Sequence, residues 1–380
     1  MLVFFGSLSA YAQVIYGKEN FIQYNVGSLP IIISVPHGGN LTPSDMPDRT
    51  CNNPTTVTDA NTIDLAQKID SVFVSKTNCA PHIIYCNLKR TKLDANRNQS
   101  NGTCGHPKAV QAWNEFHKFI DTARYLVFQK YQNRAFYFDV HGHGNPIQRV
   151  ELGYLLYDDE LALDDATLNQ PAYVENSSIQ NLVKNNPNKL SHAMLLRGQT
   201  SFGSLLEKRS FAAVPSTMNP RPGIGNNYFS GGFNTANHTC YNPLLDINGI
   251  QVECNFQNLR DTQKNRIKFA EAFVTSVIEY MDEHFGLNLM ECNPTTFTQN
   301  HEQKIPNIYP TVVNVNGILN LSNVNSGDKI SMYDQNGRLV LQNDNLKKEI
   351  QLNENVVSGI YWLNLLSGKQ NFTFKIIVID

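Results

Sequence analysis

Residues 135–144, AFYFDVHGHG, decide the fold: an apolar run ends in two histidines set among glycines. Residues 31–39, IIISVPHGG, have the same design. Short apolar runs bounded by glycine or proline are typical of buried strands, and parallel strands deliver their last residues to one edge of a sheet. The sequence therefore predicts that His37 and His141 lie near each other at that edge.

Strand-like and helix-like segments alternate through the first 285 residues or so. Helices are expected at 59–73, 107–131 and 261–285, and further strands at 81–88 and 250–253. Alternation of this kind predicts an α/β fold of three layers, in which helices flank a largely parallel or mixed sheet.

The rest of the chain divides by composition. Residues 1–12, MLVFFGSLSAYA, join an apolar stretch to a small-x-small cleavage signature, which favours a signal peptide over an apolar strand. The main domain then spans 13–292, and the polar stretch 293–305 is expected to be a linker. From 306 to 380, short strand-like runs alternate with turn signals, which predicts a small all-β sandwich.

Composition also excludes some classes of partner. A formal net charge of -2 argues against nucleic-acid binding. No segment after the N-terminal stretch approaches the roughly 18 apolar residues that a membrane span needs. The 7 cysteines form no C-x-x-C pair, so we expect some disulfides in an exported chain and at least one unpaired thiol.

His37, Asp59 and His141 are the candidate metal ligands. Two imidazoles and a carboxylate form a usual catalytic zinc set with an open fourth position, although each histidine alone would more simply cap its strand. His143 competes as a ligand, but its glycine neighbours favour a place facing substrate. Asp139, two residues before His141, is not assigned as a ligand because we place it on the opposite strand face.

Glu253 ends an apolar, β-branched strand, where partial burial would raise its pKa toward that of a general base. An ion pair with a basic residue such as Arg260 is an equally weighted alternative. Arg90 and Arg97 flank the loop after the strand at 81–88. Their planar guanidinium groups suit a substrate carboxylate, although surface arginines are most often solvated.

With these residues in view, the segment 31–284 resembles the N-formylglutamate amidohydrolase family. The motifs that carry the resemblance are VPHGG (35–39), DANT (59–62), LDANR (93–97), FDVHGHG (138–144), SGGFNTANH (230–238) and IQVECNFQNLRD (250–261). The family is similar to the zinc carboxypeptidases, which share the D-x-N-R element and a glutamate on a late strand. One departure is the family's D-x-H-S, which here ends in Gly142.

The resemblance implies a hydrolase that cleaves an amide bond in a small N-acyl amino acid or peptide with a free carboxylate. It implies one zinc ion on His37, Asp59 and His141, with Glu253 as general base. The other implied contacts, to substrate or to the developing oxyanion, are His143, Arg90, Arg97, Asn96 and His238. The alternatives are a carboxypeptidase, a hydrolase of polyglutamate or cell-wall peptides, and a non-catalytic surface binding protein.

The segment 306–380 resembles the C-terminal sorting domain of the type IX secretion system of Bacteroidetes. The stretches that carry this resemblance are IYPTVVNVNG (308–317), ISMYDQNGRLV (330–340), SGIYWLNL (358–365) and FKIIVID (374–380). It implies contact with the secretion machinery and a secreted or cell-surface location. A carbohydrate-binding sandwich is the weaker alternative, because no exposed aromatic platform stands out.

Overall fold

The computed structural model describes residues 13–223, 225–242, 246–292, 307–309, 312–322, 324–325, 327–335, 337–343, 348–367 and 370–379. The expected signal peptide and linker lie outside these described residues. The chain divides into two compact units, Met1–Thr296 and Phe297–Asp380.

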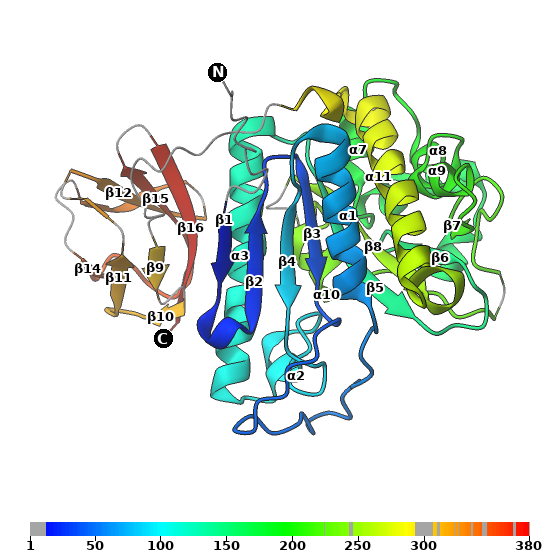
Figure 1. Cartoon of the computed structure of the whole chain (residues 1–380). Coiled ribbons are helices and arrows are strands. Elements are labelled where there is room, and N and C mark those ends of the chain that lie inside the picture. Colours follow the sequence, from blue (N-terminus) through cyan, green and yellow to red (C-terminus); the bar gives the residue numbers. More distant parts are fainter. Residues whose placement is uncertain are drawn as a thin grey trace, which may run out of the picture. The chain divides into compact units, whose positions relative to one another are not determined.

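A mixed sheet of eight strands runs through the first unit in the order β1-β2-β4-β3-β5-β8-β6-β7 (Figure 1). The strands are β1 (Gln13–Tyr16), β2 (Ile22–Val26), β3 (Ile31–Val35), β4 (His82–Cys86), β5 (Phe136–His143), β6 (Val150–Gly153), β7 (Ala213–Val214) and β8 (Asn248–Asn255). The neighbours β4, β3, β5 and β8 are parallel, whereas β6 joins β8 antiparallel. The predicted α/β class with a mixed sheet is confirmed.

Helices cover both faces of this sheet. Figure 1 shows α1 (Thr62–Thr77) beside α11 (Gln263–Phe285) on one face, with α3 (Pro107–Tyr131) on the other. The alternation along β3 explains both layers, because Ile31 and Ile33 pack in the core with α1 and α11, while Ile32 packs in the core with α3. All three predicted helices therefore exist.

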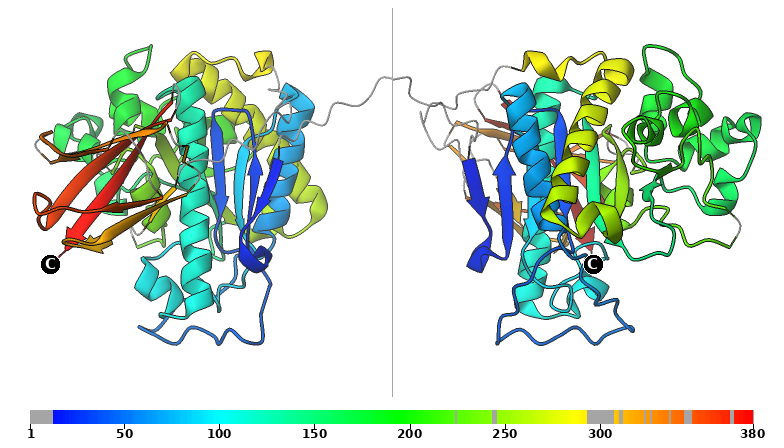
Figure 2. Two further views of the ribbon diagram at one scale, coloured as in Figure 1. Left: turned by 90° about the vertical axis from the view of Figure 1, so that its left-hand side faces the viewer. Right: turned by 45° about the vertical axis from the view of Figure 1, so that its right-hand side comes forward.

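Shorter helices complete the unit, and the right-hand view of Figure 2 shows most of them gathered in the green part of the chain. They are α2 (Gln99–Thr103), α4 (Asp158–Leu161), α5 (Asp165–Leu168), α6 (Pro171–Glu175), α7 (Gln180–Asn185), α8 (His192–Arg197), α9 (Phe202–Glu207) and α10 (Phe233–His238).

The start of α1 differs from the prediction, which placed Asp59 in the first turn of the helix. Asp59 lies in the loop before α1, and its backbone N–H donates to the His37 carbonyl at 3.1 Å. A side chain on Gly38 would overlap the Thr62 hydroxyl, so glycine lets the helix begin beside the end of β3. The loop thereby holds Asp59 next to His37.

The described residues of the second unit form strands and connecting turns without a helix, as predicted. Its strands are β9 (Asn307–Tyr309), β10 (Val312–Asn314), β11 (Ile318–Ser322), β12 (Lys329–Asp334), β13 (Leu339–Asn343), β14 (Glu349–Gln351), β15 (Gly359–Ser367) and β16 (Gln370–Ile379). They form a sheet of five strands, β10-β16-β15-β12-β13, and a sheet of three, β14-β11-β9.

Two disulfides form, Cys51–Cys104 and Cys79–Cys292. The other three cysteines are free and buried. The expectation of both bridged and unpaired cysteines is confirmed, and the structure adds the connectivity.

Asp70 on α1 generates a testable prediction about stability. Its carboxyl is buried, Oδ1 has no hydrogen-bond partner among the described residues, and burial raises its pKa from 3.8 to about 7. Since the folded chain binds this proton more tightly than the unfolded chain, the resulting stabilisation is complete below pH 3.8 and is lost as the pH rises through about 7.

We therefore expect Asp70→Asn to become more favourable with rising pH. Its effect on the free energy of unfolding should be about 2–4 kcal/mol more stabilising at about pH 8 than at about pH 4. Urea denaturation of both chains at both pH values measures this difference. An effect that does not depend on pH would contradict the raised pKa of Asp70.

Candidate functional site

Three neighbouring strands place polar side chains on the same face of the sheet. In register, His141 of β5 lies opposite Glu253 of β8, and Glu253 lies opposite Glu151 of β6. The alternate residues Val140 and Val252 belong to the core with α1 and α11. Because side chains alternate between faces, the polar row lies on the α3 side of the sheet.

His37, Asp59 and His141 come together at this face. Each offers one ligand atom, and these atoms all lie within 4.8 Å of one another in a buried position. Asp59 Oδ2 lies 3.4 Å from His37 Nδ1 and 3.2 Å from His141 Nδ1. The buried His37 Nδ1 has no hydrogen-bond partner among the described residues. Two imidazoles and a carboxylate in this arrangement could hold a metal ion.

Asp94, in the loop after β4, orients His37. Its Oδ1 accepts from His37 Nε2 at 2.6 Å and from the Asn96 N–H at 3.0 Å. Its Oδ2 accepts from Arg90 Nε at 3.0 Å. Burial alone would raise the pKa of Asp94, but His37 and Arg90 outweigh burial and lower it. With its proton on Nε2, His37 presents the Nδ1 lone pair to the cluster.

Asp139 orients His141 in the same way, and our placement of Asp139 on the opposite strand face was wrong. Its Oδ2 lies 2.8 Å from His141 Nε2, while Ser34 and Asn234 donate to Oδ1. The physical reason is the pleat of β5, because residues two apart on a strand share a face. Both histidines therefore turn Nδ1 toward Asp59 and hold Nε2 on a carboxylate.

The cluster attracts positive charge. Burial would lower the pKa of His141, but Asp139, Asp59 and Glu253 together raise it well above its usual value. Burial would likewise raise the pKa of Asp59, yet the neighbouring His141 and His37 lower it. A cation at this point would therefore be stabilised by the surrounding carboxylates.

Glu253 lies beside the cluster, with Oε1 4.0 Å from His141 Nδ1. Oε1 accepts from Gln251 Nε2 at 3.0 Å, whereas the buried Oε2 has no partner among the described residues. Burial raises the pKa of Glu253 to about 8. A carboxyl group with this pKa can exchange a proton near neutral pH.

The alternative ion pair of Glu253 with Arg260 does not occur among the described residues. Arg260 instead donates to the carbonyls of Cys254, Ala60 and His143. Its guanidinium fills the space that a side chain at residue 142 would need. This packing leaves room for glycine at position 142 and not for a larger residue.

Of the other residues predicted to contact substrate, Arg90 and Asn96 lie at the cluster and Arg97 does not. Arg90 belongs to the cluster, since its Nη1 lies 3.6 Å from Asp59 Oδ1. Asn96 is buried, and its Nδ2 lies 3.2 Å from His141 Nε2. Arg97 is exposed and donates to the carbonyl of Asn96. Arg90 and Asn96 thus support the cluster, and Arg97 stands outside it.

The two other histidines predicted to contact substrate, His143 and His238, form hydrogen bonds or ion pairs with other groups. His143 donates from Nε2 to the Arg149 carbonyl at 2.8 Å, and its Nδ1 accepts from the Asn145 N–H at 3.1 Å. His238 on α10 lies 2.7 Å from His117 Nδ1 and 3.3 Å from Asp121 Oδ1. The structure does not bring His238 to the cluster.

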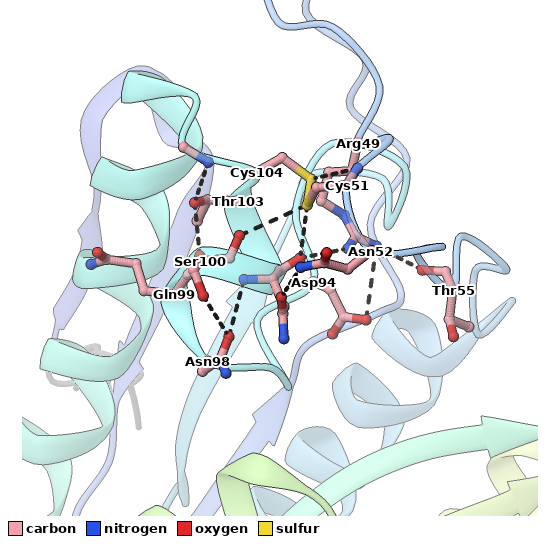
Figure 3. Close-up of a disulfide and its surroundings, with 12 residues drawn as sticks. Arg49, Cys51, Asn52, Thr55, Asp94, Asn98, Gln99, Ser100, Thr103 and Cys104 are labelled. Atoms are coloured by element: carbon pink, nitrogen blue, oxygen red, sulfur yellow. Dashed lines mark hydrogen bonds and ion pairs between the residues drawn. A yellow bond between two sulfur atoms is a disulfide. The ribbon is translucent and has the colours of Figure 1, made fainter.

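Figure 3 shows the loop that contains Arg49 and Cys51, near Asp94. The Cys51–Cys104 bridge ties this loop to the end of α2. Arg49, on the same loop, donates to the carbonyls of Arg90, Asn101 and Thr55, and its Nη2 lies 3.8 Å from Asp94 Oδ2. Sequence patterns did not predict that Arg49 and Asp94 support the site, although Asp94 lies in the LDANR motif (93–97).

Comparison with known proteins identifies the C-terminal unit. Residues 307–379 match the model of the secretion system C-terminal sorting domain. The predicted type IX sorting domain is therefore confirmed, and it marks the chain as a protein secreted and attached to the cell surface in Bacteroidetes. Such a domain implies interaction with the secretion machinery.

Two solved structures show distant similarity. One is PorZ, a surface component of the type IX secretion system of Porphyromonas gingivalis, with a TM-score of 0.19 and 20% identity over 23% of this chain and 13% of that one. The other is a candidate carboxypeptidase A from Shewanella denitrificans, with a TM-score of 0.32 and 12% identity over 69% of this chain and 60% of that one. This chain thus covers less than two thirds of either protein.

No curated protein matches the chain. Within the described ranges, none of the helices combines the length and apolar character that crossing a membrane requires.

The orienting role of Asp94 can be tested by metal binding. Asp94→Asn should weaken the affinity for Zn²⁺ about 10- to 100-fold, because His37 loses the carboxylate that fixes its tautomer and ring. Titration against a competing chelator measures the affinity. Asp282→Asn, exposed on α11, is the matched control. Equal affinities in the three chains would show that Asp94 does not orient a ligand.

Proposed function

We propose that residues 13–292 form a secreted, zinc-dependent amidohydrolase of the N-formylglutamate amidohydrolase type. In this proposal residues 1–12 are a signal peptide, 293–305 a linker and 306–380 the sorting domain. The observation that carries the proposal is the convergence of two histidine Nδ1 atoms and Asp59 beside Glu253.

The donor set suits zinc. Two imidazole nitrogens and one carboxylate oxygen are ligands that Zn²⁺ prefers at catalytic sites, and both imidazoles have carboxylate partners on their other nitrogen. The unpartnered, buried His37 Nδ1 is the kind of polar atom that a metal would satisfy. When bound, zinc would lower the pKa of a coordinated water and polarise a carbonyl.

Glu253 is the proposed general base. Its Oε2 is buried without a partner, so this oxygen is free to accept a proton from the attacking water. Gln251 holds the other oxygen and fixes the carboxyl group beside His141. Glu253 would then pass the proton to the leaving amine. Arg90, beside Asp59, provides positive charge for the developing oxyanion.

Burial favours a small substrate. His37, Asp59, His141 and Glu253 are each less than one-tenth exposed. A compact N-acyl amino acid fits such a site better than a polymer does. The motif resemblance supports the same class, with a free carboxylate on the substrate. Export by the sorting domain suits scavenging of such compounds outside the cell.

A substrate panel with an active-site variant tests the function. Zinc-loaded full chain should hydrolyse N-formylglutamate, and Glu253→Gln should lower kcat about 10²- to 10⁴-fold while metal content stays unchanged. Glu175→Gln, exposed at the end of α6, is the control. Activity is followed by the release of free amine.

Other outcomes separate the alternatives. Cleavage of short peptides but not of formyl amino acids would identify a carboxypeptidase or a cell-wall peptide hydrolase. Binding without turnover of any substrate would identify a surface binding protein. Full activity of Glu253→Gln would refute the general-base assignment.

A further inference from the structure

Arg149, immediately before β6, is a buried arginine with unused donors. The residue is 6% exposed, and neither Nε nor Nη2 has a hydrogen-bond partner among the described residues. The nearest ion-pair partner is Glu151, whose Oε1 lies 3.7 Å from Nε, beyond hydrogen-bond distance.

Glu151 has other partners besides this ion pair. Its two oxygens accept from Asn145 Nδ2 at 3.2 and 3.3 Å, and Oε2 also accepts from the Phe229 N–H at 3.1 Å. A buried donor without a partner costs about 1–3 kcal/mol, and such groups are rare in folded proteins. The free donors of Arg149 therefore indicate a ligand.

Arg149 also lies next to the candidate active site. Its carbonyl accepts from His143, two residues beyond His141 on β5. Glu151, two residues along the chain from Arg149, is the register partner of Glu253. Since Arg149 Nε lies 3.7 Å from Glu151 Oε1, the guanidinium lies beside the row of Glu253 and Glu151.

The other arginines near the cluster donate to neighbouring protein groups or stand in solvent. Arg90 binds Asp94 and the Val57 carbonyl. Arg260 and Arg49 each donate to three backbone carbonyls. Arg97 is exposed. Arg149 thus combines burial, free donors and proximity to Glu253.

We propose that Arg149 binds a carboxylate of the substrate and sets the preference of the site for acidic over neutral substrates. A guanidinium presents two parallel N–H groups that match a carboxylate, and burial strengthens the pair. This inference rests on the proposed amidohydrolase function for the kinetic comparison, but not for the binding comparison below.

The kinetic experiment compares N-formylglutamate with N-formylglutamine in the full chain. Arg149→Gln should lower kcat/KM for the acid about 10- to 100-fold, mainly through KM, and leave the neutral amide almost unchanged. Arg134→Gln, an exposed arginine just before β5, is the matched control and should preserve the ratio. An unchanged ratio in Arg149→Gln, or its loss in Arg97→Gln instead, would overturn the proposal.

The binding experiment uses glutarate and its monoamide, measured by calorimetry on the same chains without turnover. The parent should prefer glutarate, and Arg149→Gln should lose that preference while its thermal unfolding remains cooperative. Should Arg149→Gln fail to fold, Arg149→Lys should retain the charge but only part of the preference. Full preference in Arg149→Lys together with an unchanged kcat/KM ratio would contradict bidentate recognition.

Together, the kinetic and binding experiments distinguish failure of the proposed amidohydrolase function from failure of the proposed role of Arg149. Preference for glutarate that depends on Arg149, without hydrolysis of any substrate, would refute the amidohydrolase and support the anion site. Hydrolysis without any preference for the acid would support the enzyme and refute the role of Arg149.

Discussion

The candidate site depends on two buried pairs, in which Asp94 holds His37 and Asp139 holds His141 by their Nε2 atoms. A hydrogen bond at one nitrogen of an imidazole fixes its tautomer and helps to orient the other nitrogen. With Nε2 fixed on a carboxylate in both residues, the two Nδ1 atoms face Asp59. The parallel register of β3 and β5 brings the two pairs together, so the geometry of the cluster depends on the pairing of these strands.

Burying these acids has an energetic cost that the surroundings offset. A buried carboxylate needs several hydrogen bonds or a nearby cation to remain charged. Asp94 accepts hydrogen bonds from His37, Asn96 and Arg90. Arg49, on the loop tied by the Cys51–Cys104 bridge, adds a nearby positive charge. The disulfide thus stabilises the surroundings of His37, a candidate ligand, as well as the loop, and a disulfide suits an exported protein.

Sequence patterns predicted the parts of the candidate site that lie at the ends of strands. Apolar runs ending in His-Gly predicted the convergence of His37 and His141, because parallel strands share an edge. The prediction for Asp139 was wrong because residues two apart on a strand share a face, so the spacing D-x-H already places Asp139 on the side of His141. The contacts of Asp94 and Arg260 join segments that lie far apart in the sequence, and no periodic pattern reveals such contacts.

The most direct test of this account is the metal content of the purified full chain beside a His141→Ala variant. Elemental analysis after reconstitution with Zn²⁺ should give about one ion per parent chain and little in the variant, because a three-ligand site retains metal weakly after losing one ligand. A parent chain that takes up no metal, or a variant that binds as much as the parent, would contradict a metal centre at His37, Asp59 and His141.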